Sequence, residues 1–191
     1  MRIILASTSI YRRQLLERLG MPFEVAAPRG EEQRIPGESP GEMVRRLAEE
    51  KAHSVAGEFP DAVIIGSDQV AVMDGLVLGK PGNFVNAAAQ LRLASGREVE
   101  FLTGLCLLSP HPPCVQTELI LFRVMFRELT ESRIRAYLER ERPFDCAGSF
   151  KSEGLGIALF ERMTGDDPTA LMGLPLIALT DMLERVGLQV I

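Results

Sequence analysis

The sequence is poor in the residues on which several common enzyme chemistries depend. Its 191 residues include no tryptophan, two histidines and three cysteines. Cys106, Cys114 and Cys146 are odd in number, lie far apart and form no C-x-x-C motif. We therefore expect neither a disulfide framework nor a zinc site, and a reducing compartment. His53 and His111 have no triad-like surroundings in the sequence, which argues against histidine-based catalysis.

Long hydrophobic runs are also missing. No apolar stretch approaches the ~20 residues that a membrane helix requires, and residues 1–9 read as a first strand rather than a signal peptide. Acidic residues (26) outnumber basic ones (21), which argues against sequence-independent binding of nucleic acid. The hydrophobic share of 46% and the charged share of 25% are ordinary for a globular chain. We expect a cytoplasmic protein without membrane or stable nucleic-acid partners.

Two familiar phosphate-binding motifs are absent, and lysine is scarce. The sequence contains neither G-x-x-x-x-G-K-[ST] nor a G-x-G-x-x-G after a strand, which disfavours kinase and dinucleotide-binding functions. Eighteen of the 21 basic residues are arginine, and the lysines are Lys51, Lys80 and Lys151. A genome preference for arginine codons would explain the many arginines expected at the surface. The remaining lysines are then enriched at sites that need a compact point charge, and phosphate sites are one such class.

Hydrophobic periodicity and capping residues predict one domain over residues 1–191, without linkers or repeats. Strands are expected at 2–6, 23–26, 62–72, 76–78, 99–108, 115–126 and 157–161. Helices are expected at about 10–19, 40–56, 83–95, 130–142 and within 169–186, the second starting at a capping box of Ser39 and Glu42. Gly66, Ser67 and Asp68 are expected to interrupt the third strand. The irregular alternation predicts an α/β protein with a mixed sheet and flanking helices.

The start of the first helix favours an anion. Arg12 and Arg13 lie in its first turn, where the helix dipole is already positive and acidic residues are preferred. The free backbone N–H groups, the hydroxyls of Ser7 and Ser9 and two guanidinium groups would together hold a phosphate well. The alternative is a solvated charged turn.

Asp68 is the second anomaly, because a carboxylate in the middle of an apolar strand is disfavoured. A bulge that turns the side chain into a cleft would explain it, and an Asp that faces solvent beside a turn is the alternative. The loop over residues 28–39 carries Glu31 and Glu32. These acids and Asp68 could jointly hold a hard divalent cation such as Mg²⁺, which prefers one or two carboxylates plus substrate phosphates.

Several motifs in order resemble the Maf family of nucleoside triphosphate pyrophosphatases. They are LASTS-x-x-RR, the acidic pair at 31–32, AEEKA, IIGSDQV, LGKP and CAGSFKSEGLG followed by GLPL, and they cover nearly the whole chain. The SDQ and KSEG segments are similar to the branch that acts on 7-methyl-GTP. The resemblance implies a mixed α/β fold with two lobes around a central cleft, as in Maf and ITPase-like proteins. It also implies hydrolysis to a nucleoside monophosphate and pyrophosphate, a divalent cation (Mg²⁺ or Mn²⁺) and a cytoplasmic location.

The resemblance also implies roles for individual residues. Asp68 would be the proton acceptor, and Tyr11, Gln69 and Glu153 would be specificity positions. The metal ligands would be Asp68 and an acid of the 31–32 pair, for which we take Glu32. The phosphate contacts would come from Ser7, Ser9, Arg12, Arg13, Lys51, Lys80 and Lys151. The branch usually has tryptophan at the position of Tyr11, and the family usually has Asp-Glu where Glu31 and Glu32 stand.

The chemistry of the substrate is consistent with these roles. A water activated by Mg²⁺ and deprotonated by Asp68 would attack the α-phosphorus, while the basic side chains offset a triphosphate charge of about −4. Methylation at N7 makes guanine cationic, which suits a facing carboxylate from Glu153 and an aromatic face from Tyr11. Two alternatives stay open at this point: a dTTP or UTP pyrophosphatase, and a nucleotide-binding regulator of cell division or septum formation. We expect a monomer or a homodimer.

Overall fold

The computed structural model describes residues 1–30 and 32–191, and Glu31 lies outside the described residues. The strands are β1 (Arg2–Ala6), β2 (Glu24–Ala26), β3 (Ala62–Met73), β4 (Leu76–Leu78), β5 (Glu98–Pro110), β6 (Pro113–Phe126) and β7 (Phe160–Thr164). The α-helices are α1 (Ile10–Glu17), α2 (Pro40–Ala56), α3 (Phe84–Ala94), α4 (Glu131–Glu141) and α5 (Leu176–Arg185). Short 3₁₀ helices are η1 (Ala147–Ser149), η2 (Leu155–Leu159) and η3 (Pro168–Met172).

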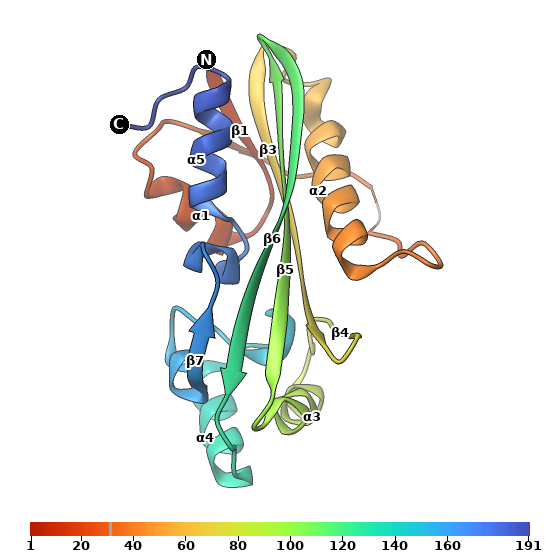
Figure 1. Cartoon of the computed structure of the whole chain (residues 1–191), viewed down its shortest axis with the longest axis vertical. Coiled ribbons are helices and arrows are strands. Elements are labelled where there is room, and N and C mark those ends of the chain that lie inside the picture. Colours follow the sequence, from red (N-terminus) through yellow and green to blue (C-terminus); the bar gives the residue numbers. More distant parts are fainter. Residues whose placement is uncertain (31) are drawn as a thin grey trace. The chain divides into compact units, whose positions relative to one another are not determined.

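The strands form one mixed sheet in the order β2-β1-β3-β5-β6-β7, with β4 paired to β3 (Figure 1). β1 pairs in parallel with both β2 and β3, whereas the β3–β4 and β6–β7 pairs are antiparallel. The predicted α/β class with a mixed sheet and flanking helices is therefore confirmed. None of the helices among the described residues is both long and apolar enough to cross a lipid bilayer.

The chain divides into two compact units. The first unit comprises Met1–Gln69, Thr103–Ile120 and Asp167–Ile191, and the second comprises Val70–Leu102 and Leu121–Asp166. Strands β3, β5 and β6 contribute residues to both units because the boundaries fall within them.

The first unit has a hydrophobic core on each face of its part of the sheet. Successive side chains of a strand point to opposite faces, so β1 divides its apolar residues between the two cores. Ile3 and Leu5 pack with buried leucines of α1 and α5, whereas Ile4 and Ala6 pack with Ala48 of α2 and its neighbours. Figure 1 shows α1 and α5 on one side of these strands and α2 on the other. The first unit is thus a three-layer α/β structure.

Four phenylalanines form a buried cluster in the second unit. Phe150 lies at its centre, in edge-to-face contact with Phe101, Phe126 and Phe160 at centroid distances of 5.2, 5.7 and 4.8 Å. Such geometry is favoured by the ring quadrupoles. Because Phe150 immediately precedes Lys151, the cluster fixes the backbone at the start of the K-S-E-G segment.

Two details of the predicted elements are wrong. β3 runs without interruption from Ala62 to Met73, so the polar residues at 66–68 are part of the strand. The strand expected at 157–161 begins at Phe160, because the preceding apolar residues form η2. A short apolar run does not distinguish strand from helix, which explains this shift. The capping box at the start of α2 is confirmed, since the Ser39 hydroxyl accepts from the Glu42 N–H and the Glu42 carboxylate accepts from the Ser39 N–H.

Candidate active site

The turn between β1 and α1 places two serine hydroxyls beside the positive end of a helix. Ser7 is buried, and its Oγ accepts a hydrogen bond from the Ser9 N–H at 3.1 Å. The Ser9 side chain in turn caps α1 by accepting from the Arg12 N–H at 3.4 Å. The first turn of α1 contains no acidic residue, so its dipole is not offset from within the helix. This turn has the features of an anion-binding site.

The two adjacent arginines of α1 lie in different environments. Arg12 is half-buried, and its Nε donates to the Gly173 carbonyl at 2.8 Å. Burial lowers the pKa of the Arg12 guanidinium, while the negative charges of Asp68 and Glu32 act in the opposite direction. Arg13 is exposed and pairs with Glu17 at 3.1 Å. Arg12 is therefore fixed within the first unit, whereas Arg13 lies at its surface.

The polar residues of β3 divide between the two faces of the sheet. Gly66 faces α2, because a Cβ built on it would overlap the Ala48 carbonyl oxygen. Asp68, two residues further, faces the same helix and is only 6% exposed. Ser67 and Gln69 point the other way, toward the segment that follows β7. Asp68 is therefore buried rather than solvent-facing, and strand alternation places it without the bulge that we expected.

Two glycines let α2 lie directly on the sheet. In addition to the contact at Gly66, a Cβ on Gly104 of β5 would overlap the Val44 carbonyl oxygen of α2. The helix backbone therefore contacts the strand backbones at two points without intervening side chains. This close approach brings the Lys51 ammonium from α2 to within 2.5 Å of the Asp68 Oδ1.

Lys51 lies between two carboxylates. Its Nζ is 2.5 Å from Asp68 Oδ1 and 2.7 Å from Glu32 Oε1. The Lys51 and Asp68 side chains are 12% and 9% exposed, whereas Glu32 is 61% exposed. The structure therefore brings together Lys51, Asp68 and Glu32, three residues that the sequence placed on a helix, a strand and a loop.

The same two carboxylates are the residues that could hold a divalent cation. Since both touch one ammonium nitrogen, their oxygens are separated by no more than the sum of the two distances, about 5.2 Å. Two ligands of one Mg²⁺ at opposite corners of an octahedron are about 4.2 Å apart, so the spacing suits the cation if the Lys51 ammonium, which touches both oxygens, moves aside. The described residues contain no group of three or more acidic, histidine or cysteine ligands. The donor set fits a cation held by one or two carboxylates and completed by substrate phosphates.

The segment after β7 contributes contacts that the sequence analysis missed. The Gly173 carbonyl accepts from Arg12 Nε and from the Ser67 hydroxyl, both at 2.8 Å. Gln69 Nε2 donates to the Ala170 carbonyl at 2.6 Å and to Thr103 Oγ1 at 3.0 Å. Backbone carbonyls of residues 170–173 thus orient side chains from α1 and β3. In the sequence, only the G-L-P-L motif drew attention to this segment. Every residue has a backbone carbonyl, so contacts made by carbonyls cannot be recognised from residue types.

Asp167 and Thr169 hold that segment in place. The buried Asp167 carboxylate accepts from the Thr169 hydroxyl at 2.6 Å and from the Ile177 N–H at 2.8 Å. The Thr169 hydroxyl accepts from the Leu176 N–H at 2.7 Å. The two side chains therefore satisfy the first N–H groups of α5, which begins after a proline and has no adjacent side-chain cap.

The remaining predicted residues have the following positions. Tyr11 is half-buried on α1 in the first unit. Lys80, Lys151 and Glu153 belong to the second unit. Lys80 is exposed after β4, Lys151 is half-buried with its N–H bonded to Tyr137 Oη, and Glu153 is exposed. Their roles stay predictions.

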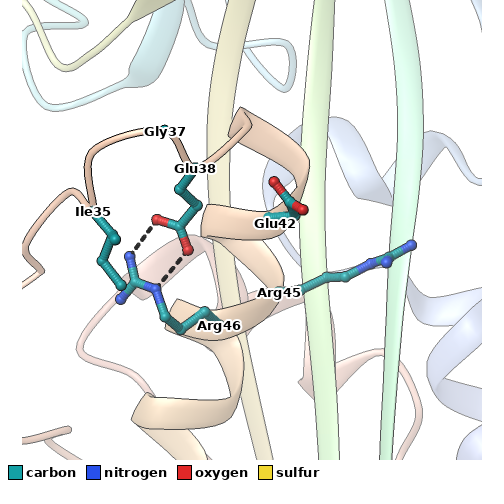
Figure 2. Close-up of a pocket in the computed structure, with 6 residues that line it drawn as sticks. All are labelled: Ile35, Gly37, Glu38, Glu42, Arg45 and Arg46. Carbon is teal, nitrogen blue, oxygen red and sulfur yellow. Dashed lines mark hydrogen bonds and ion pairs between the residues drawn. The ribbon is translucent and has the colours of Figure 1, made fainter.

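A hollow of about 450 Å³ lies near the start of α2, away from the predicted residues. It is lined by Ile35, Gly37, Glu38, Glu42, Arg45 and Arg46. Arg46 forms a paired contact with the Glu38 carboxylate, two bonds of 2.7 Å each, and Arg45 extends away from that pair (Figure 2). The Arg46 cation is thus already neutralised within the chain, and the hollow contains none of the residues expected to act on a substrate.

Comparison with known proteins agrees with the order of motifs along the chain. Residues 2–186 match the family described as "Maf-like protein". A protein of Pseudomonas aeruginosa named 7-methyl-GTP pyrophosphatase is 55% identical over 98% of both chains. Proteins of the same name from Nitrosococcus oceani (53%, over 99% of this chain and 95% of the relative) and Pseudomonas syringae pv. tomato (52%, over 98% of both) are similar. A full-length match of this extent, on a fold with the buried Asp68 in its strand, establishes that the chain belongs to the Maf family.

Proposed function

We propose that this chain is a nucleoside triphosphate pyrophosphatase that hydrolyses 7-methyl-GTP to the monophosphate and pyrophosphate. The names of its relatives support the substrate. The observation that carries the proposal is the buried Asp68 carboxylate, held at 2.5 Å by Lys51 beside the acid of Glu32. A buried carboxylate paired with a lysine, in the same unit as a helix N-terminus whose first turn lacks acids, suits hydrolysis of a polyanion.

In this proposal Asp68 accepts the proton of the attacking water. The water oxygen bonds to the α-phosphorus, the bond between that phosphorus and the bridging oxygen breaks, and pyrophosphate leaves with the bonding electrons. Arg12 and Lys51 neutralise phosphate oxygens as the charge shifts, and the Ser7 and Ser9 hydroxyls orient them. A divalent cation held by Asp68 and Glu32 would supply further positive charge and make the water more acidic.

The other predicted residues are assigned by their chemistry. We assign Arg13, Lys80 and Lys151 to the phosphate chain. The lysine ammonium is a compact point charge and the arginine guanidinium a planar set of donors, and both groups bind phosphate well. Glu153 and Tyr11 face the cationic base. The Gln69 Nε2 already donates to backbone carbonyls, so its Oε1 is the atom we assign to the N–H groups of the guanine edge. We also propose that residues 1–191 act as one catalytic domain in the cytoplasm, where the three cysteine thiols would stay reduced.

The test of this proposal combines a substrate panel with a charge-removing variant. The purified protein is incubated with 7-methyl-GTP, GTP, UTP and dTTP, with Mg²⁺ or with a chelator, and monophosphate and pyrophosphate are quantified. We expect 7-methyl-GTP to have the highest kcat/KM and the chelator to abolish turnover. Asp68→Asn should bind nucleotide normally and lose about 10²–10⁴-fold in kcat. Asp61→Asn is the matched control, since Asp61 is an exposed aspartate that directly precedes the same strand.

Each other outcome has a defined meaning. A higher kcat/KM for UTP or dTTP would change the proposed substrate, while the proposed hydrolysis to monophosphate and pyrophosphate would stand. Near-normal turnover of Asp68→Asn would remove Asp68 from its role. Nucleotide binding without turnover, accompanied by nucleotide-dependent partner binding that survives Asp68→Asn, would replace the hydrolase by a regulator.

A further inference from the structure

Two side chains of α3 hold the backbone on both sides of Lys80. Gln90 Nε2 donates to the Gly79 carbonyl at 3.1 Å, and Asn86 Nδ2 donates to the Pro81 carbonyl at 2.9 Å. The two amides are four residues apart and therefore lie one above the other on the helix. The turn that carries Lys80 is thus attached to α3 at the residue before and the residue after the lysine, although the lysine side chain itself is exposed.

Gln90 also holds the segment that carries Lys151. The Ser149 hydroxyl donates to Gln90 Oε1 at 2.5 Å, from a fully buried position with a positive φ of 63°. A serine in this backbone region is strained, so its surroundings must hold it there. Two residues later, the Lys151 N–H donates to Tyr137 Oη at 3.0 Å. One amide side chain therefore uses its donor on the Lys80 turn and its acceptor on the Lys151 segment.

We propose that Gln90 is a positioning residue that sets the separation of Lys80 and Lys151 along the phosphate chain of the substrate. This inference rests on the proposed function, in which both lysines contact phosphates. An amide suits this place because it donates and accepts at once, and Gln90 donates to the Gly79 carbonyl while it accepts from the Ser149 hydroxyl. Lysine ammonium groups act on a phosphate only where the backbone brings them within reach, and misplacement by about 1 Å can cost about 10²-fold.

Other contacts keep the second unit folded when Gln90 is changed. A backbone hydrogen bond from Gly82 N to the Phe144 carbonyl, at 2.9 Å, also joins the chain just after the Lys80 turn to the chain before η1. Phe150 remains anchored in the phenylalanine cluster. The expected effect of a Gln90 variant is therefore looser placement of the lysines rather than global unfolding.

The first experiment compares Gln90→Leu with Gln116→Leu. Gln116 is a matched control in the first unit, since its Nε2 donates to the Met182 carbonyl at 3.0 Å. We expect Gln90→Leu to raise the KM for 7-methyl-GTP and lower kcat/KM by about 10-fold. Gln116→Leu should leave kcat/KM within about 2-fold of the wild-type value, even if it lowers the Tm as much as Gln90→Leu does. An equal loss in both variants, or unchanged kinetics in Gln90→Leu, would overturn the proposal.

A second set of variants separates positioning from general stability. Gln90→Glu keeps the acceptor for Ser149 and loses the donor for Gly79, while Ser149→Ala does the reverse, so each should give an intermediate loss. Combining Gln90→Leu with Lys151→Ala should cost less than the product of the two single effects, because a misplaced lysine contributes less. Fully multiplicative effects would contradict a role through Lys151.

Binding of inorganic pyrophosphate, measured by titration calorimetry, makes the inference independent of turnover. We expect Gln90→Leu to weaken pyrophosphate binding about 10-fold and Gln116→Leu to leave it unchanged. A wild-type protein that binds pyrophosphate but hydrolyses no nucleotide would refute the proposed function, while the response to Gln90→Leu still decides the positioning role. Equal pyrophosphate affinity in wild type and Gln90→Leu would refute the positioning role alone.

Discussion

Gly66→Ala adds one methyl group at the point where α2 rests on β3. The new Cβ would lie well under 3.0 Å from the Ala48 carbonyl oxygen and 3.0 Å from the Ala52 Cβ. Because non-bonded heavy atoms prefer about 3.5–4.0 Å, helix and strand must separate by about 1 Å. Overpacking of this kind costs about 1–3 kcal/mol, which corresponds to a Tm lower by about 2–12 °C for a chain of this size.

The same displacement reaches the candidate site. Lys51 is carried by α2 and Asp68 by β3, so their 2.5 Å contact spans the interface that the methyl group opens. A shift of about 1 Å there should lower kcat for 7-methyl-GTP by up to about 10²-fold. The measurements are thermal or urea unfolding and steady-state kinetics on the same preparation.

Gly57→Ala is the control for adding a methyl group next to this helix. Gly57 has helical backbone angles, and a Cβ there meets nothing within 4 Å. We expect it to be neutral or to stabilise by about 0.4–1 kcal/mol, with normal kinetics. If Gly66→Ala matched Gly57→Ala in both Tm and kcat, the close approach of α2 would not determine the position of Lys51.

Two further predictions concern other parts of the molecule. Glu153→Gln should lower the ratio of kcat/KM for 7-methyl-GTP to that for GTP, because it removes the carboxylate assigned to the cationic base; an unchanged ratio would exclude a charge-based readout. Burial raises the pKa of the Cys106 thiol to about 11 from 9.0. The unfolded thiol therefore ionises first, so the free energy of unfolding should fall by up to about 2–3 kcal/mol as the pH rises from 9 to 11. Cys106→Ala should show a shallower fall in urea unfolding, and an identical slope would contradict the buried neutral thiol.

The sequence predicted the features that depend on neighbouring residues. The capping box of Ser39 and Glu42 is a local hydrogen-bond pattern, and it marked the start of α2 correctly. The apolar neighbours of Asp68 marked it as unusual, but a cleft and a solvent-facing position both stayed open, and the structure shows it buried. Glu32 and Asp68 were predicted to share one cation, whereas the contact of Lys51 with both carboxylates is visible only in the fold.

The sequence could not predict contacts made through backbone atoms. The sequence predicts an interruption of the strand at Gly66, whereas β3 runs through this residue and α2 lies against it there. The carbonyl of Gly173 orients Arg12 across 161 positions of chain. Gln90 was unremarkable in sequence, because an amide on a helix surface gives no sign of the two segments it joins.

The interleaving of the two units has a consequence for synthesis on the ribosome. The carbonyls that orient Arg12, Ser67 and Gln69 belong to residues 170–173, which emerge after the whole second unit has been made. A nascent chain that stops at residue 166 would contain the proposed proton acceptor and its lysine, yet it would lack the segment that fixes the arginine and Gln69. The first unit can therefore complete this arrangement only after residues 170–173 have been translated.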